Sequence, residues 1–257
     1  MPDQEIIKPD ISSADEGEEE FESEMTFLEH LEELRWRIIY SLIGLIIGAA
    51  LCWFFIDYII DVVLLKPARD SGAKLQNLKP FGQLFVYMQV AIVGGIILSL
   101  PNLFYQLWKF IAPALKKTER RYIFLIVIYT TFCFLSGIAF AYFIMLPLTL
   151  SFAAQFGSSQ IANEFAIDEY LSIIISVMLA AGVIFELPMI SFFLSKLGIL
   201  SPAFMRKYRK HAIVGIMVIA AVLTPGTDPV SQLILAIPLV LLYEISIFIS
   251  KLSAKKS

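Results

Sequence analysis

Six long stretches of apolar residues divide the chain and define its class before any motif is considered. They run approximately over 38–56, 84–107, 122–146, 169–194, 212–223 and 230–250. About 20 consecutive apolar residues cross the roughly 30 Å hydrocarbon core of a bilayer. Because backbone polar groups find no water partners there, each stretch is expected to be helical. The pattern therefore predicts an all-α membrane protein with six transmembrane helices.

The fifth stretch is short for a membrane span. Its twelve residues, 212–223, make about 18 Å of helix, and the turn at 224–229 contains two prolines and a glycine that stop it. Two explanations remain open. Either the bilayer is thinner around the last two spans, or the helix begins earlier and Lys210 and His211 snorkel to the interface.

Prolines recur inside the other spans or near their ends. Each removes a backbone donor and bends its helix. Bent helices that pack side by side favour a curved wall over a straight bundle, so a cupped arrangement is expected. The prolines concerned are Pro101, Pro147, Pro188 and Pro238.

The distribution of Lys and Arg predicts the orientation. Sixteen of these bases fall before the first span, between spans two and three, between spans four and five, or after the last span. Only Lys66, Arg69, Lys74 and Lys79 fall on the other side. Because cytoplasmic loops carry the excess of Lys and Arg, both termini are expected in the cytoplasm.

The composition of the chain supports a membrane protein and separates its two ends from the membrane domain. Apolar residues make up 58% of the chain, above the roughly 45–50% of soluble domains. Residues 1–24 contain the run ADEGEEEFESE and one base, Lys8, which predicts a disordered acidic tail rather than a secretory leader. This tail either repels or screens basic partners or has no role. The expected organisation is the tail at 1–24, a six-span domain at 25–251 and a short C-terminal tail at 252–257.

Three polar side chains fall where lipid would surround them. Glu186, in the sequence FELP, lies about nine residues from the cytoplasmic end of its span, roughly 13 Å deep. A carboxylate there costs about 2.5–3.5 kcal/mol, which favours a functional group over a structural one. Glu244 is expected to be structural or interfacial. Gln232 either bonds to a neighbouring helix or forms part of a polar site.

Two segments outside the spans carry further candidates. The segment FLEHLEELRWR, residues 27–37, has apolar residues at helical spacing and is expected to be an amphipathic helix at the cytoplasmic interface. Between spans two and three, Trp108 is expected to be an interfacial anchor. Glu119 stands beside Arg120 and Arg121, a pattern that by itself favours a local salt bridge.

Five motifs in register resemble one family. HLEELRWR, LWKFIAPALKKTERR, AFAYFIMLPL, FELP and LTPGTDPVSQLILAIPLVLLYEIS occur in this order, and together they are similar to the TatC family, the core subunit of the twin-arginine protein translocase. The resemblance covers about residues 26–250. It implies a cupped set of six helices with short fifth and sixth spans.

The resemblance also implies functional residues. Glu33 and Glu119 match the family's carboxylates that recognise signal peptides with two consecutive arginines, and Arg35 and Phe110 shape the same surface. A carboxylate accepts the planar guanidinium fork bidentately, which lysine cannot reproduce. Glu186, with Gln232 and Asp228, would dock partner helices inside the membrane.

The implied partners are twin-arginine signal peptides of folded precursors, single-span TatA- and TatB-like subunits, and further copies of the chain in a homo-oligomeric complex. The implied location is the bacterial cytoplasmic (inner) membrane, with the proton motive force as the energy source. Pro67 is implied to shape the first outer loop.

Two other classes compete with this interpretation. A secondary transporter or channel would use Glu186 as an ion site, but no matching pair of broken helices or internal repeat is present. A membrane enzyme would need a nucleophile, acid–base pair or metal cluster, and the sequence offers none; His30 and His211 stand alone, and Cys52 and Cys133 are expected to pack as small apolar residues. No cofactor or nucleic-acid partner is expected.

Overall fold

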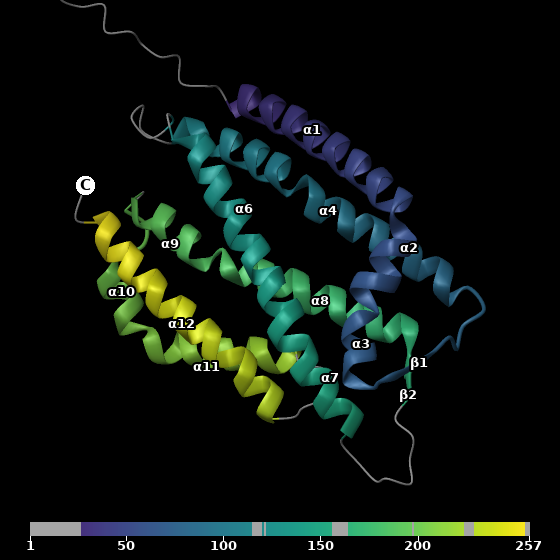
Figure 1. Cartoon of the computed structure of the whole chain (residues 1–257). Coiled ribbons are helices and arrows are strands. Elements are labelled where there is room, and N and C mark those ends of the chain that lie inside the picture. Colours follow the sequence, from purple (N-terminus) through teal and green to yellow (C-terminus); the bar gives the residue numbers. More distant parts are fainter. Residues whose placement is uncertain are drawn as a thin grey trace, which may run out of the picture.

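The computed structural model describes residues 27–114, 120, 122–155, 164–196, 198–223 and 229–254. Within these residues, six helical rods match the six predicted spans (Figure 1). Five of them are long and apolar enough to cross a membrane. The acidic tail, Glu119 and Asp228 lie outside the described residues. The rods are α1 (Phe27–Phe54), α4 (Gly82–Ile111), α6 with η3 and α7 (Ile123–Phe140, Ala141–Met145, Leu146–Gln155), α8 with α9 (Ile167–Phe185, Leu187–Lys196), α11 (Arg209–Leu223) and α12 (Pro229–Ala254).

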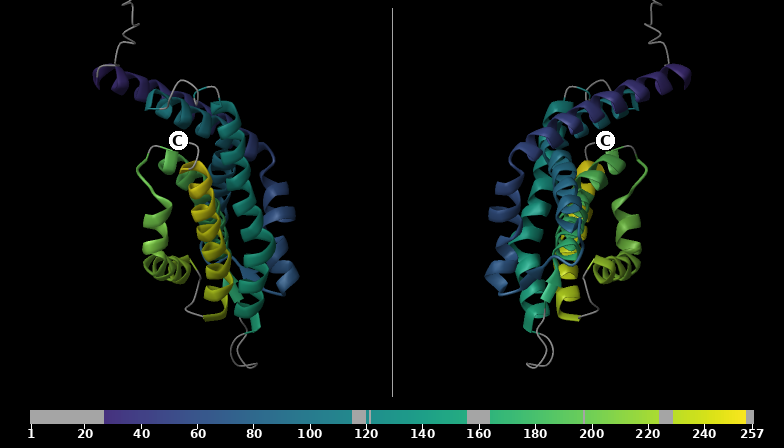
Figure 2. Two further views of the ribbon diagram at one scale, coloured as in Figure 1. Left: turned by 90° about the vertical axis from the view of Figure 1, so that its left-hand side faces the viewer. Right: turned by 90° about the vertical axis from the view of Figure 1, so that its right-hand side faces the viewer.

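The rods form a thin, curved layer when they are seen edge-on (Figure 2). α1 packs along α4, α4 also contacts α6, and α6 packs against α8. α9 packs against α12, and α11 also packs against α12. The all-α, cupped membrane fold expected from the prolines is therefore confirmed.

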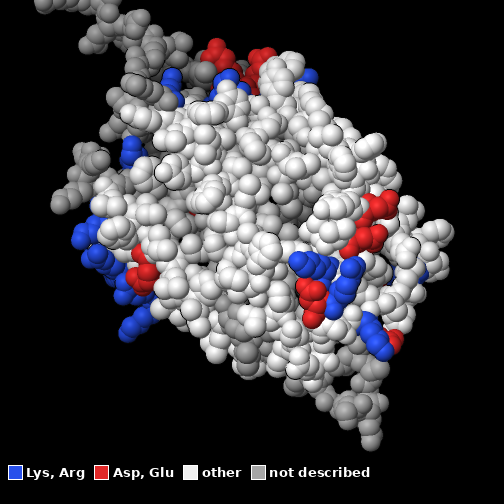
Figure 3. All heavy atoms as spheres, in the orientation of Figure 1, with Lys and Arg blue, Asp and Glu red and all other residues white. Residues whose placement is uncertain are grey.

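Two ends of the molecule serve as landmarks. The basic end holds the start of α1, the end of α4, the start of α6, the end of α9 and α10 (Pro202–Lys207); the opposite end holds α2 (Ile56–Tyr58), η1 (Ile59–Leu64), α3 (Lys66–Ser71) and a small sheet. On the face shown in Figure 3, charged side chains gather near the rim and an uncharged band crosses the middle. Apolar side chains such as Ile46, Phe132 and Ile237 point outward, as contact with lipid requires.

The expected amphipathic segment at residues 27–37 is not a separate helix. It forms the first turns of α1, which runs for 28 residues without a break, because no glycine or proline separates it from the apolar span. At 1.5 Å per residue α1 is about 42 Å long. That exceeds the roughly 30 Å hydrocarbon core, so the charged first turns extend past it.

Two prolines change their helices in different ways. The third span continues past its expected end at residue 146 to Gln155, because the wider π-helical turn η3 comes just before Pro147 and accommodates its ring. Before Pro188 the helix breaks instead. The N–H of Glu186 bonds to the carbonyl of Val183, three residues back, so α8 ends there and α9 begins at Leu187.

The short fifth span is confirmed. α11 has 15 residues and begins at Arg209, so it includes Lys210 and His211 and is about 22 Å long. The earlier start was one of the two expected explanations, although the helix still falls short of a roughly 30 Å core. α12, which follows it, has 26 residues, and its segment Leu235–Leu252 is long and apolar enough to cross a membrane.

The opposite end is tied together by hydrogen bonds between distant segments. The hydroxyl of Tyr170 accepts from the N–H of Ala68 at 3.0 Å and donates to the carbonyl of Leu64 at 2.9 Å. The buried Pro67 lies between these two residues in the first turn of α3. Tyr170 therefore fixes the first outer segment against α8.

A two-stranded parallel sheet, not expected from the sequence, adds to this tie. β1 (Lys74–Gln76) pairs with β2 (Glu164–Ala166), because each short segment leaves backbone groups that need partners at the end of a span. Nearby, the Lys79 ammonium pairs with Asp168, and this hydrogen bond raises the pKa of Lys79.

The close approach of α1 and α4 depends on two facing glycines. A Cβ added to Gly95 would lie 2.5 Å from the backbone nitrogen of Ala49, and one added to Gly48 would lie 2.6 Å from the carbonyl oxygen of Gly95. Neither distance is sterically possible, so both positions require glycine. Small residues of this kind let the backbones of two membrane helices approach closely, and van der Waals packing then stabilises the pair.

We expect Gly95→Val to push α1 and α4 apart and to lower the thermal unfolding midpoint of the protein in detergent. Overpacking a close contact typically costs about 1–3 kcal/mol. Gly215→Val is the matched control, because a Cβ at Gly215 meets nothing within 4 Å. Equal midpoints for the two variants would contradict the importance of this contact.

Candidate functional site

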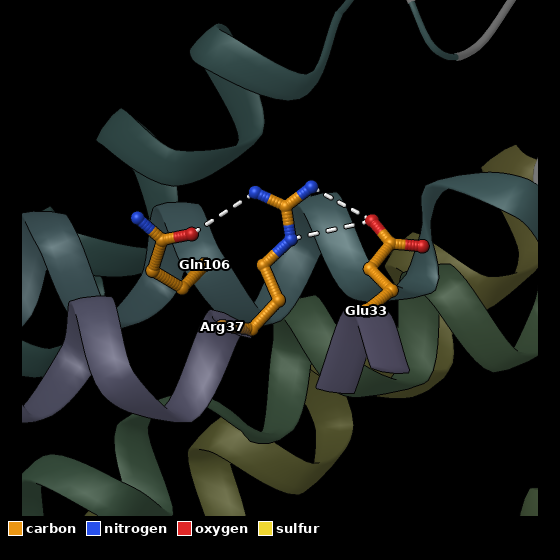
Figure 4. Close-up of polar contacts among 3 residues, drawn as sticks. All are labelled: Glu33, Arg37 and Gln106. Carbon is orange, nitrogen blue, oxygen red and sulfur yellow. Dashed lines mark hydrogen bonds and ion pairs between the residues drawn. The ribbon is translucent and has the colours of Figure 1, made fainter. Parts of the chain in front are cut away.

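The main polar site lies at the basic end, where the start of α1 packs along the end of α4. Because glycines hold the two helices close together, the side chain of Arg37 on α1 reaches Gln106 on α4 (Figure 4). Glu33 lies one turn before Arg37 on the same face of α1. We call Glu33, Arg37, Gln106 and Asn102 the α1–α4 polar cluster.

The guanidinium of Arg37 is the centre of this cluster. Its Nε and Nη2 both donate to Oε1 of Glu33, at 3.3 and 2.7 Å. Its Nη1 turns the other way and donates to Oε1 of Gln106 at 3.1 Å, as Figure 4 shows. One guanidinium thus joins a carboxylate on α1 to an amide on α4.

Further hydrogen bonds hold Gln106 in place. Its Nε2 donates to Oδ1 of Asn102 at 3.3 Å, and Nδ2 of Asn102 donates to the backbone carbonyl of Tyr40 at 3.1 Å. The chain of bonds returns to α1 one turn beyond Arg37. The cluster is therefore braced across both helices.

One oxygen of Glu33 has no partner within the described part of the chain. Oε1 accepts both bonds from Arg37, whereas Oε2 is shielded from solvent and no described residue donates a hydrogen bond to it. The Glu33 side chain is 19% exposed. An ionised carboxylate accepts at both oxygens, and a buried acceptor left unsatisfied requires an explanation. Oε2 of Glu33 can therefore accept a bond from one further donor.

The other residues expected at this site are placed differently. Phe110 stacks on His30, with ring centroids 4.4 Å apart, so it packs the end of α4 against α1. Arg35 is exposed and, two residues from Glu33, faces another side of the helix. The structure thus brings Phe110 to the site and leaves Arg35 outside the cluster.

Trp108 corrects an expectation. It is 6% exposed, its Nε1 donates to Oγ1 of Thr130 at 3.3 Å, and its ring packs edge-on against Phe193 at 4.8 Å. The predicted interfacial anchor is therefore wrong. Because α6 and α9 cover this side of α4, the indole joins three helices instead of facing lipid headgroups.

The second candidate site surrounds Glu186, at the break between α8 and α9. Its side chain is buried, at 7% exposure, and Oε1 has no hydrogen-bond partner among the residues that the structure describes. Beyond the break, an apolar groove of about 360 Å³ runs between α6, α9 and α12. Cys133 and Pro188 line it, and Lys196 lies along it. A buried acid next to an apolar groove suits a helix with one polar side chain.

The remaining polar candidates join α11 to its neighbours. Nε2 of Gln232 donates to the carbonyl of Met217 at 3.0 Å, which is the helix–helix bond that was one alternative for it. Glu244 pairs with Arg209 at the basic end, where both side chains are partly exposed. These contacts attach α11 to α12.

The sequence did not single out the roles of Arg37, Gln106 and Asn102. Arg37 counted only as a base for orientation. The available signal was the pair of amides at 102 and 106, four residues apart within an apolar span, since such a pair shares one helix face. Their partner on another helix could not be read from the sequence.

These features define a multi-pass, all-α membrane protein with a polar cluster at one end and a buried carboxyl group within its fourth span. Among the residues that the structure describes, no group of His, Cys, Asp or Glu side chains is arranged to hold a metal ion.

Comparison with known proteins identifies the family. The family model described as Sec-independent protein translocase protein (TatC) matches residues 29–238. The Sec-independent protein translocase protein TatC of Carboxydothermus hydrogenoformans is 38% identical over 227 residues, covering 88% of this chain and 93% of that protein. The protein of the same name from Aquifex aeolicus is 36% identical over 236 residues, covering 90% and 97%. This chain belongs to the TatC family, whose members are components of the Sec-independent protein translocase.

Solved structures agree with this assignment. A crystal structure of the twin arginine translocase receptor TatC matches the chain with a TM-score of 0.76 and 38% identity, covering 88% of this chain and 99% of that one. A second crystal structure of that receptor, in DDM, gives a TM-score of 0.77 at 37% identity. The resemblance drawn from the five motifs is confirmed.

Proposed function

We propose that this chain is the receptor and core subunit of a twin-arginine translocase in the bacterial cytoplasmic membrane. It binds the twin-arginine signal peptides of folded precursors and nucleates the translocation complex. The observation that carries the proposal is the unpartnered Oε2 of Glu33 in a chain of the TatC family. A basic leader peptide supplies the donor that this oxygen lacks.

The chemistry favours arginine at this position. A guanidinium offers directed N–H donors in a plane, and its bonds to a carboxylate are short and charge-assisted. A lysine ammonium is a compact, strongly hydrated charge without that fork. Glu119, which lies outside the described residues, would supply the second carboxylate for the second arginine.

Orientation supports the same assignment. The basic end carries the surplus of Lys and Arg, which favours the cytoplasmic side for it, the compartment in which precursors are made. Both termini then lie on that side, and the α1–α4 polar cluster faces incoming leaders. The opposite end, with its tied outer segment, faces away from the cytoplasm.

Glu186 has a separate role in the proposal. Its buried carboxyl group and the apolar groove beyond it form a docking place for TatA- and TatB-like single-span helices, with Gln232 and Asp228 as polar neighbours of a partner helix. The translocase draws its energy from the proton motive force, which yields about 2.3 kcal/mol per charge over 100 mV. In this role the chain acts as a transport subunit and not as an enzyme.

Changing Glu33 and Glu119 together to Gln should remove recognition of a twin-arginine leader. Each charge-assisted bond contributes about 1.5–3 kcal/mol, so the double variant should bind at least about a hundredfold more weakly. Affinity would be measured by photocrosslinking to a labelled precursor, with membrane insertion checked in parallel.

Glu32→Gln is the matched control for this experiment, because Glu32 is an exposed neighbour on α1 that lies outside the cluster. It should leave crosslinking unchanged. If the double variant crosslinks as well as Glu32→Gln does, Glu33 and Glu119 are not the recognition groups.

Glu186→Ala should weaken assembly with the single-span partners more than it weakens leader binding, because Glu186 lies within the span and apart from the α1–α4 polar cluster. Copurification of the partners would measure the first effect and crosslinking of the leader the second. Glu186→Gln, which keeps a polar group, should retain more assembly than Glu186→Ala. A larger loss of leader binding than of assembly would argue against this role.

A further inference from the structure

The pairing between Arg37 and Glu33 is asymmetric. A guanidinium beside a carboxylate commonly forms two parallel bonds, one to each oxygen. Here Nε and Nη2 both reach Oε1 of Glu33, and Oε2 receives nothing from Arg37. The side chain of Arg37 is 16% exposed, so water has little access to hydrogen-bond with these groups.

Gln106 accounts for the asymmetry. Its Oε1 accepts Nη1 of Arg37 at 3.1 Å, which draws the guanidinium toward α4 and away from Oε2 of Glu33 (Figure 4). Gln106 is itself 8% exposed and is oriented by its bond to Asn102. The acceptor for Arg37 is thus held in a fixed place by a second amide.

We propose that Gln106 is a positioning residue for leader recognition, because by holding Nη1 of Arg37 it keeps Oε2 of Glu33 open for an incoming guanidinium. This inference rests on the proposed function of Glu33. Gln106 acts through Arg37 and makes no contact with the leader. Arg37 satisfies half of the Glu33 carboxylate in the free protein and leaves the other half for the ligand.

Removal of the Gln106 acceptor has a specific consequence. Nη1 of Arg37 then lacks a partner in a shielded place, and the guanidinium regains its bonds by closing over both oxygens of Glu33. The internal arginine then competes with the first leader arginine for Oε2. A leader with lysines in both places should lose less binding affinity, because an ammonium does not depend on the planar arrangement of donors that a guanidinium has.

The test uses the full-length protein in lipid nanodiscs and two labelled leader peptides, one with paired arginines and one with paired lysines. Gln106→Met keeps the length of the side chain without the acceptor. It should weaken binding of the arginine leader about tenfold, the scale of one charge-assisted bond, and change binding of the lysine leader less than about twofold. Gln106→Glu keeps an acceptor oxygen and should bind the arginine leader at least as tightly as the parent protein.

Gln83→Met, at an exposed position in the first turn of α4, is the control for substitution on the same helix and should leave both affinities unchanged. Thermal unfolding midpoints establish that each variant is folded. Equal weakening of both leaders by Gln106→Met, no weakening of either, or failure of Gln106→Glu to restore binding would overturn the proposal.

Glu33→Gln, measured in the same way, separates this inference from the proposed function. If Glu33→Gln still prefers the arginine leader as strongly as the parent protein, the role of Glu33 fails and the inference fails with it. If Glu33→Gln loses that preference while Gln106→Met keeps it, only the role of Gln106 is refuted.

Discussion

The close packing of α1 against α4 is the constraint on which the polar site depends. Gly48 and Gly95 let the backbones of α1 and α4 approach so closely that a Cβ at Gly95 would clash with the backbone of Ala49. At that separation Arg37 spans the interface, bonds to Glu33 on its own helix and reaches Gln106 on the other. One oxygen of the Glu33 carboxylate is satisfied by Arg37, and the other has no hydrogen-bond partner among the described residues.

The fourth span also contains a buried carboxyl group with an oxygen that no described residue pairs with. Pro188 prevents a regular helix, so the chain breaks at Glu186 and presents its carboxyl group beside an apolar groove. Insertion of a carboxylate at such depth costs about 2.5–3.5 kcal/mol. Two other polar side chains in the membrane domain are bonded internally: Gln232 bonds to Met217, and Glu244 pairs with Arg209. Buried carboxylate oxygens of Glu33, Asp168 and Glu186 have no hydrogen-bond partner among the described residues. Asp168 pairs with Lys79 through its other oxygen at the opposite end, so Glu33 and Glu186 are the two that we propose as sites for other polypeptides.

The sequence predicted the spans, the short fifth helix and the family, because lipid imposes length, apolarity and helicity on each segment. It also predicted that prolines would disturb the helices, and α8 does end just before Pro188. A π-helical turn precedes Pro147 and the helix continues, whereas Pro101 and Pro238 lie inside the unbroken helices α4 and α12. It could not predict which side chains meet across helices. Trp108 was expected at an interface and is buried against Thr130, and the bond between Arg37 and Gln106 joins residues 69 positions apart. Such pairings depend on helix rotation and separation, which apolar periodicity does not specify.

A double-mutant cycle can show whether Glu33 pairs directly with an arginine of the leader, as we propose. It combines Glu33→Gln on the protein with a change of the first leader arginine to lysine, and both are measured by equilibrium binding. Residues in contact show coupling energies of about 0.5–3 kcal/mol, whereas distant residues add independently. For a direct charge-assisted bond between the two groups we expect coupling of at least about 1 kcal/mol. Additive effects of the two changes would mean that Glu33 does not pair with this arginine.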